Sequence, residues 1–298
     1  MKKSSFIRLG LFLSLAFVAV GCANTARTGA NQKLTIYASV YPMYDFAVKL
    51  AGGQADVYNL MEGSGDPHDW EPTPQDIVRL QNADLFVYNG AGLEHWADSA
   101  IDTLKGTPVR VVEASQGLTL LQGDGQQDPH VWLDPTLAKQ EMENIKNAMA
   151  AADPAHAAEY EKNFEHYAAA FDELDKSFAD SLAPLPNKTI VVAHQAYGYL
   201  CDAYGLTQMP LAGIDPDVEP TLLQIKDVID FVNNHQVKTV YYEEAIGTKL
   251  ADALAKETGA QLALLYPIEG LTQAQKDAGN DYFSLMEANR EALVKGLR

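Results

Sequence analysis

A long helical run in the middle of the chain is the feature that most constrains its fold. Between residues 154 and 182, large apolar side chains recur at steps of three or four residues, the period of an α-helix. They are Tyr160, Phe164, Tyr167, Phe171, Leu174, Phe178 and Leu182. Pro184 and Pro186 end the run. At about 1.5 Å per residue, Pro154–Leu182 predicts a rod of roughly 40 Å, with Asp153 as its N-cap.

Short apolar, β-branched segments alternate with helical patterns on both sides of this rod. The predicted strands are Lys33–Val40, Asp56–Met61, Asp84–Tyr88, Val109–Glu113, Thr189–Ala193, Met209–Ala212, Lys238–Tyr242 and Gln261–Tyr266. The predicted helices are Met43–Leu50, Pro74–Asn82, Glu94–Leu104, Thr136–Ala152, Ala196–Tyr204, Glu219–His235, Thr248–Thr258 and Asp281–Leu297. Such alternation favours parallel sheets. We therefore expect an α/β protein with two parallel-sheet α/β lobes joined by one long rigid backbone helix.

The N-terminus has the pattern of an export signal. Lys2, Lys3 and Arg8 precede the uncharged apolar run Leu9–Val20, which is too short to span a membrane and typical of a signal peptide. Small residues then lead into Cys22, as in a bacterial lipoprotein signal, where the cysteine thiol carries the lipid. The alternative is an ordinary secretory signal with an incidental cysteine. We expect an extracytoplasmic protein, lipid-anchored to the cell membrane.

The chain divides into five predicted segments. Residues 1–21 are the signal peptide, and the small, polar residues 22–32 are a flexible lipid-anchored tether. The N-terminal lobe covers 33–152, the linking helix 153–183 and the C-terminal lobe 184–298. Once Cys22 is lipidated, Cys201 is the one remaining cysteine, and its apolar surroundings predict a buried free thiol.

Composition excludes several classes of protein. A hydrophobic fraction of 47% is enough for packed cores, so a wholly disordered chain is excluded. The formal net charge of −18 disfavours a nucleic-acid binder, which needs basic surface. Two cysteines exclude a disulfide scaffold and a cysteine-based zinc cluster. The chain also lacks the common hydrolase, nucleotide-binding and zinc-protease motifs.

Three histidines occupy positions where an α/β protein binds ligands. An Asp-Pro-His sequence ends at His68 and another at His130, both in predicted loops, and His194 directly follows the strand Thr189–Ala193. Open α/β sheets bind ligands at the carboxyl ends of their strands. Imidazole is a preferred ligand for zinc and related divalent ions. His95 lies near a predicted helix start, where capping or surface packing is the simpler interpretation.

A carboxylate would complete the site. Glu269 follows the last predicted strand, and Glu243 and Glu244 compete with it for the fourth position. Three histidines and one glutamate form a reasonable tetrahedral shell for Zn²⁺. Two candidates precede the rod and two follow it, which predicts a metal site in the interlobe cleft. The carboxylates expected to orient the rings are Asp69, Glu71, Asp134 and Glu244.

These motifs together resemble the zinc- and manganese-type solute-binding lipoproteins of metal ABC importers. The family's histidine motifs match Pro67–Pro72, Asp128–Pro135 and Val192–His194, and its Pro-Leu-Glu-Gly-Leu-Thr segment matches Pro267–Thr272. The resemblance covers nearly the whole mature chain and implies two α/β lobes, a rigid helix and a metal ion in the cleft. It carries the fourth ligand over to Glu269. It also implies an ABC permease and its ATPase subunit as partners of a monomeric receptor.

One departure and one detail refine this resemblance. Many zinc-specific members carry a histidine-rich loop before the second histidine, whereas Gln116–Gln127 is short and has no histidine. Manganese members usually have Glu in place of the third histidine and Asp as the fourth ligand. Because this chain has His194 and Glu269, the resemblance favours Zn²⁺ as the transported ligand, with Mn²⁺ as the alternative.

Three other functions remain open from the sequence. One is a manganese receptor of the same class. Another is a zinc hydrolase that uses Glu269 or Glu244 as a general base, although a site closed by four protein ligands leaves no position for an activated water. The third is a surface adhesin on the same fold. We expect a zinc receptor that is not an enzyme.

Overall fold

The computed structural model describes residues 33–63, 65–123, 125–216, 220–244 and 248–298. The predicted signal peptide, the lipidation site Cys22 and the tether 22–32 lie outside the described residues. Within the described ranges, no helix is both long enough and apolar enough to cross a membrane.

Four parallel strands form the sheet of the N-terminal lobe, in the order β2-β1-β3-β4. The strands are β1 (Leu34–Ala38), β2 (Ala55–Asn59), β3 (Leu85–Tyr88) and β4 (Arg110–Glu113). The helices that follow the first three are α1 (Tyr41–Ala51), α2 (Pro74–Gln81) and α3 (Ala97–Leu104). Central strands of parallel sheets are covered on both faces, and Leu85, Phe86 and Val87 of β3 are accordingly all fully buried.

A second parallel sheet forms the C-terminal lobe, in the order β10-β9-β7-β8. Its strands are β7 (Thr189–Val192), β8 (Thr207–Pro210), β9 (Thr239–Tyr242) and β10 (Gln261–Leu264). The helices between them are α6 (Gly198–Tyr204), α7 (Leu222–His235) and α8 (Lys249–Thr258). The expected fold class, two parallel-sheet α/β lobes, is confirmed.

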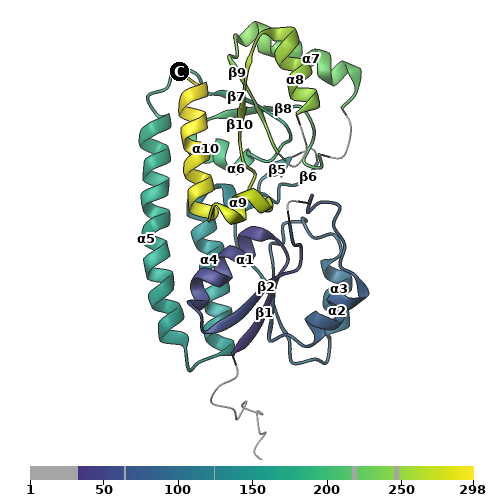
Figure 1. Cartoon of the computed structure of the whole chain (residues 1–298), viewed down its shortest axis with the longest axis vertical. Coiled ribbons are helices and arrows are strands. Elements are labelled where there is room, and N and C mark those ends of the chain that lie inside the picture. Colours follow the sequence, from purple (N-terminus) through teal and green to yellow (C-terminus); the bar gives the residue numbers. More distant parts are fainter. Residues whose placement is uncertain (1–32, 64, 124, 217–219, 245–247) are drawn as a thin grey trace, which may run out of the picture. The chain divides into compact units, whose positions relative to one another are not determined.

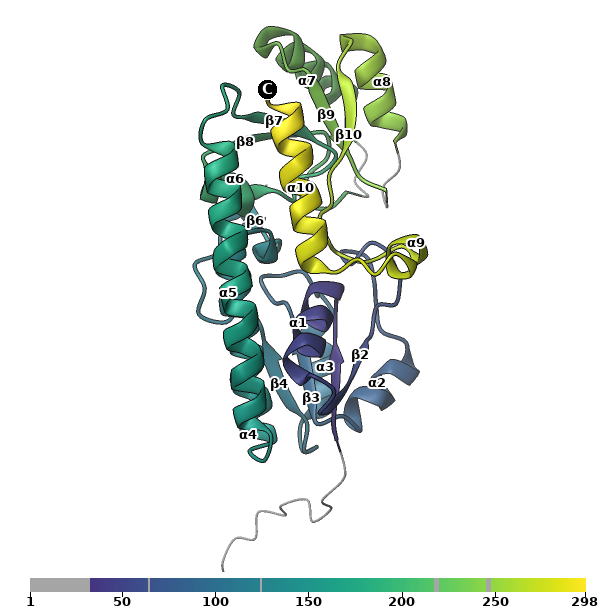
Figure 2. The same cartoon turned by 60° about the vertical axis from the view of Figure 1, so that its left-hand side comes forward.

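Helix α5 (Ala157–Leu182) runs alongside both sheets (Figure 1). It packs against α4 (Pro135–Ala152), and α10 (Tyr282–Gly296) lies beside it (Figure 2). Aromatic rings join these helices to α1. Phe46 lies 5.7 Å from Phe171 and 5.0 Å from Tyr282 between ring centroids, and the last two rings are 5.5 Å apart. One hydrophobic core therefore crosses from lobe to lobe, and the domain limits 33–152, 153–183 and 184–298 remain a prediction.

The start of the long helix differs from the prediction. Asp153 ends α4 and does not cap α5, whose N-cap is His156. The chain must reverse direction between two packed helices, and residues 153–156 make that turn. The Asp153 carboxylate lies 2.6 Å from His156 Nδ1 and accepts a hydrogen bond from Tyr160 Oη at 2.9 Å, so it secures the turn from both sides.

Several short elements were not predicted. They are the hairpin β5 (Gln122–Gly123) and β6 (Gln126–Gln127), the 3-10 turn η1 (Val131–Leu133) and the helix α9 (Gln273–Asp277). A capping box between Thr272 and Gln275 starts α9. The same device at Thr221 starts α7 at Leu222, inside the predicted start at Glu219, a residue outside the described ranges. The buried thiol of Cys201 agrees with the sequence prediction, and burial raises its pKa to about 12.

Candidate metal centre

Loops at the carboxyl side of four strands carry the candidate ligands. His68 lies in the loop between β2 and α2, where its backbone N–H donates to Asp66 Oδ1 at 2.8 Å. His130 lies between β6 and η1, and His194 follows β7. Glu269 lies in the loop that follows β10. Each lobe thus contributes two of the four side chains.

The structure brings all four side chains together. One atom from each of His68, His130, His194 and Glu269 lies within 4.8 Å of the others. Glu269 Oε1 lies 3.1 Å from His130 Nε2, and 3.5 Å from the Nε2 of both His68 and His194. His130 Nε2 and His194 Nε2 are 3.4 Å apart. Below, these four residues are called the quartet.

These spacings fit a single tetrahedral ion. Zinc bonds of about 2.0–2.1 Å to nitrogen and oxygen place neighbouring ligand atoms of a tetrahedron about 3.3–3.4 Å apart. Four of the six atom pairs lie 3.1 to 3.5 Å apart, and all six lie within 4.8 Å. His68 Nε2 is also buried without a hydrogen-bond partner within the described ranges, as a lone pair kept for a metal would be. The donor set and its spacing suit Zn²⁺.

Asp128 holds His130 at two points. Its Oδ1 accepts from the His130 backbone N–H at 3.0 Å and lies 2.8 Å from the ring Nδ1. A proton on Nδ1 is thereby fixed, so Nε2 is the nitrogen that offers its lone pair to a metal once it is deprotonated. Gly198, the first residue of α6, lies against this carboxylate, and a Cβ there would overlap Asp128 Oδ2. The close approach therefore requires a glycine at this position.

Glu243 orients the ring of His194 through Nδ1, as Asp128 orients the ring of His130. Its Oε1 and Oε2 lie 3.0 and 2.9 Å from His194 Nδ1, and the glutamate is only 1% exposed. Val191 of β7 pairs with Val240 of β9, so the two functional residues, each three positions further along, leave the sheet side by side. Glu243 was a competing candidate for the fourth ligand, but it contacts the opposite side of the ring from Glu269.

Burial and charge act against each other in the quartet. Burial opposes a proton on His130, but hydrogen bonds to Asp128 and Glu269 outweigh it and raise the His130 pKa. Burial likewise opposes a proton on His194, yet the Glu243 and Glu269 carboxylates raise its pKa well above the ordinary value. Burial opposes ionisation of Glu269, and its contacts with the rings of His130, His194 and His68 hold its pKa well below the usual range. A cation that binds the imidazoles must therefore displace protons.

The loop that carries Glu269 is held from several sides. Trp132 Nε1 donates to the Pro267 carbonyl at 2.7 Å, and Tyr282 Oη donates to the Trp132 carbonyl at 2.6 Å. Ile268, directly before the glutamate, has a φ of +62°. That conformation is rare for a β-branched residue and costs about 1–3 kcal/mol. The surrounding contacts overcome this strain and fix the carboxylate.

Within the described ranges, none of the four carboxylates predicted to orient the rings forms a hydrogen bond or ion pair with a ring of the quartet. Asp134 caps α4 and accepts from the Thr136 backbone N–H at 2.7 Å. Glu71 pairs with His95, with Glu71 Oε1 3.3 Å from His95 Nε2. Asp69 and Glu244 are exposed. The rings of His130 and His194 are instead oriented by Asp128 and Glu243, so the prediction chose neighbours of the right chemistry at the wrong positions.

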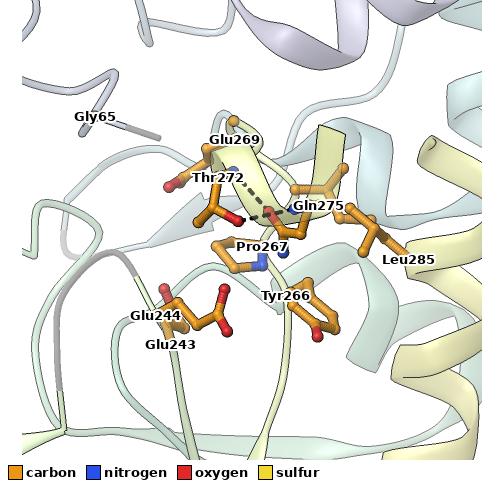
Figure 3. Close-up of a pocket in the computed structure, with 11 residues that line it drawn as sticks. Gly65, Glu243, Glu244, Tyr266, Pro267, Glu269, Thr272, Gln275 and Leu285 are labelled. Atoms are coloured by element: carbon orange, nitrogen blue, oxygen red, sulfur yellow. Dashed lines mark hydrogen bonds between the residues drawn. The ribbon is translucent and has the colours of Figure 1, made fainter. Parts of the chain in front are cut away.

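Two hollows with separate linings reach the quartet, one at His68 and one at Glu269. One, of about 400 Å³, is bordered by His68, Asp69, His95, Gln126 and Asp215 among others, and we call it the vestibule. The second is far smaller, about 30 Å³, and Glu243, Glu244 and Glu269 border it. Figure 3 shows this second hollow, where the Thr272–Gln275 capping box lies beside Glu269.

Comparison with known proteins gives one family match and close relatives. Residues 36–296 match ZnuA, described as "Zinc-uptake complex component A periplasmic". The "High-affinity zinc uptake system protein ZnuA" of Bacillus subtilis is 36% identical over 309 residues, covering 97% of either chain. The "Zinc-binding lipoprotein AdcA" of Streptococcus pneumoniae is 33% identical over 98% of this chain, which spans only 60% of that protein.

Solved structures agree with these sequence relatives. The Zn(II)-bound ZnuA-like domain of Streptococcus pneumoniae AdcA is 34% identical, with a TM-score of 0.81 over 89% of this chain and 99% of that one. The laminin binding protein Lmb of Streptococcus agalactiae is also 34% identical, with a TM-score of 0.84 over 90% of this chain and all of that one. Lmb is described as a bifunctional protein with adhesin and metal transporting activity.

Proposed function

Because this chain belongs to the ZnuA family of zinc-uptake components, we propose that it is the high-affinity extracytoplasmic zinc receptor of an ABC importer. It binds Zn²⁺ through His68, His130, His194 and Glu269 and delivers the ion to a membrane permease driven by an ATPase subunit. The observation that carries this proposal is the convergence of four donor atoms from both lobes within 4.8 Å of one another, close enough to share one ion.

The donor set favours zinc over manganese. Three imidazole nitrogens and one carboxylate oxygen match Zn²⁺ in both ligand type and coordination number. Manganese prefers more oxygen ligands. The relatives named above are zinc-uptake or zinc-binding proteins, which supports the same choice. Manganese transport is therefore the alternative, and the ratio of the zinc and manganese affinities distinguishes the two.

The proposed receptor does no bond-breaking chemistry. Four protein ligands fill a tetrahedral shell and leave no position for an activated water, which a catalytic zinc site keeps open. The general bases considered for a hydrolase also have other roles in this proposal. Glu269 is itself a ligand, and Glu244 is exposed at the edge of the small hollow.

We place the receptor on the outer side of the cell membrane, as a monomer tethered through lipid on Cys22. The basic, apolar and Gly-Cys order of the N-terminus supports the tether, as does the description of AdcA as a lipoprotein. Cys22→Ala should move the protein from the membrane to the soluble fraction after cell fractionation. Stable anchoring takes more than one acyl chain, so mass spectrometry of the mature N-terminus should find more than one.

Native mass spectrometry with metal analysis tests the receptor function directly. The purified mature chain should bind one zinc ion and release it to a chelator. Free zinc at about 100 times its Kd adds about 2.7 kcal/mol to the free energy of unfolding, so the melting temperature should rise clearly. His68→Ala and His194→Ala should each remove most of that rise. His166→Ala, an exposed histidine on α5, is the matched control and should keep it. A full rise in either site variant contradicts the assignment.

Adhesion is a second candidate, which the likeness to the laminin binding protein Lmb supports. Immobilised laminin is the probe. Saturable binding by the zinc-loaded mature chain, absent for a denatured control, would support it. Binding that zinc-site variants abolish would link adhesion to the metal, whereas no binding would remove the hypothesis.

A further inference from the structure

The quartet is nearly closed to solvent, which raises the question of how zinc reaches it. His130 and His194 are fully buried, and the side chains of His68 and Glu269 are each 8% exposed. His68 borders the vestibule, and Glu269 borders the small hollow. These two hollows are the openings beside the quartet that we compare as routes for the ion.

Size separates the two openings. The small hollow offers about 30 Å³ to the centre of a water-sized sphere, whereas the vestibule offers about 400 Å³. A hydrated zinc ion carries several waters and needs the larger space. The vestibule opens onto His68. Of the two, the vestibule is therefore the better route for an ion with part of its hydration shell.

The lining of the vestibule suits a cation. Asp69, His95 and Asp215 border it together with His68, and of the described residues around it none is Lys or Arg. The chain as a whole carries a formal net charge of −18. A hollow lined by one sign of charge concentrates counter-ions and speeds their association.

A preformed pair of zinc-type ligands lies at the outer rim. His95 Nε2 is 3.3 Å from Glu71 Oε1, with the side chains 48% and 73% exposed. The spacing is that of two ligand atoms on one tetrahedral ion. The neighbouring residues Trp70 and Trp96 pack edge to face with ring centroids 5.3 Å apart, which joins the loop of His68 to the loop of His95. Two exposed ligands bind weakly, as a site that passes an ion onward must.

We infer that Zn²⁺ reaches the quartet through the vestibule, with the Glu71–His95 pair as its first, transient ligands. This inference rests on the proposed receptor function. In this route the ion passes Asp69 on its way from the pair to His68. His68 Nε2 then replaces one of the last waters bound to the ion. A group that only lowers the barrier to passage changes the association and dissociation rates by the same factor and leaves the Kd unchanged.

Stopped-flow zinc transfer to and from a fluorescent chelator measures both rates on the full mature chain. The double variant Glu71→Gln with His95→Ala should slow association and dissociation alike, by about tenfold, with the Kd within about twofold of the parent. Glu71→Lys should slow association further. His166→Ala is the matched exposed-histidine control, and Glu244→Gln tests the small hollow. Both should leave the rates unchanged.

The possible results separate the inference from the function beneath it. Unchanged rates in the double variant, or slowing in Glu244→Gln alone, would overturn the vestibule route while zinc binding by the parent chain stands. A weaker Kd with an unchanged association rate would also overturn it, because the pair would then support the quartet. Absence of tight zinc binding by the parent chain would instead refute the receptor function.

Discussion

Asp128 Oδ1 lies 2.8 Å from His130 Nδ1 and also accepts the backbone N–H of the same histidine. One carboxylate therefore fixes the ring, its tautomer and the loop that carries it. Asp134, four residues after His130, caps α4 instead. Two aspartates that flank one histidine thus have separate roles, one electronic and one structural.

Asp128→Asn should weaken zinc binding by about tenfold, because a neutral amide supports the imidazole less well than a carboxylate does. Asp134→Asn is the matched control. It removes the same charge near the same histidine, but Asn caps helices as well as Asp does, so affinity and stability should both persist. Isothermal titration against a competing chelator measures both. Equal losses in the two variants would show a general charge effect and contradict the role of Asp128.

Gly198→Ala should also weaken zinc binding, although Ala suits a helix better than Gly does. The added methyl would overlap Asp128 Oδ2 and push the carboxylate away from His130. A loss of about tenfold is expected, similar to that of other changes to groups that orient a metal ligand. The test is a double-mutant cycle. In an Asp128→Ala background the Gly198 substitution should cost no further affinity, and additive losses would rule out this explanation.

Periodicity carries most of the fold prediction. The apolar spacing in α5 and the β-branched runs of β3, β7 and β9 arise from burial, which is local in sequence, so both lobes could be predicted. The hairpin β5–β6 and the helix α9 have no buried apolar face of this kind, and α9 is set by the Thr272–Gln275 capping box. The turn at Asp153 depends on the packing of α4 against α5, which no local pattern encodes.

The candidate site also has a part that the local sequence predicts and a part that it does not. The three histidines and Glu269 follow strands or repeat an Asp-Pro-His motif, and the structure brings them together. Glu243 lies 49 residues from His194, and their contact depends on the pairing of β7 with β9. Asp128 lay within the quoted motif, but its contact requires the loop to fold back onto its own ring. Strand order and loop conformation are therefore what the sequence analysis lacked.

His194→Glu should narrow the preference for zinc over manganese. A carboxylate in place of an imidazole costs Zn²⁺ more than Mn²⁺, which favours oxygen ligands. Because Glu243 faces position 194, the variant should be combined with Glu243→Gln to remove the repulsion between two carboxylates. Competition titration at fixed pH gives the ratio of the two affinities. Glu243→Gln alone is the control, and an equal loss for both metals would mean that His194 does not set selectivity.

The stabilisation by zinc should shrink as the pH falls. In the metal-free protein, carboxylates raise the pKa of His130 and His194 despite their burial, so these protons stabilise that form below the unfolded value of about 6.5 and this gain is lost as the pH rises through the folded pKa. Zinc requires the deprotonated rings, so its affinity also rises as the pH rises. Glu269, with its depressed pKa, stays ionised throughout.

Melting curves at buffered free zinc from pH 5.5 to pH 8 measure this effect. The difference in melting temperature between the zinc-loaded and metal-free protein should grow steadily with pH. A difference that stays constant over this range would mean that the rings bind zinc without losing protons, and would contradict the ligand assignment.

Glu141 offers a prediction about stability away from the quartet. This residue of α4 is fully buried, and neither carboxylate oxygen has a hydrogen-bond partner among the described residues. Burial, with the nearby charges of Glu94 and Asp134, raises its pKa well above the usual range. In the unfolded chain a glutamate ionises above about pH 4.3. Glu141 therefore costs stability as the pH rises above that value, until the folded pKa is reached.

Glu141→Gln removes the ionisable group and keeps the shape. The free energy of unfolding of the variant relative to the parent should rise from pH 5 to pH 8, because only in the parent does folding require this carboxyl to stay protonated over that range. The buried amide brings its own unpaired donors, so the sign of the difference at pH 5 is not the test; its change with pH is. Glu143→Gln, an exposed glutamate on the same helix, is the matched control and should give a difference that does not depend on pH. Urea denaturation of the metal-free protein measures both variants. Parallel pH profiles for the Glu141 variant and the parent would show that Glu141 ionises in the folded protein as it does in the unfolded chain.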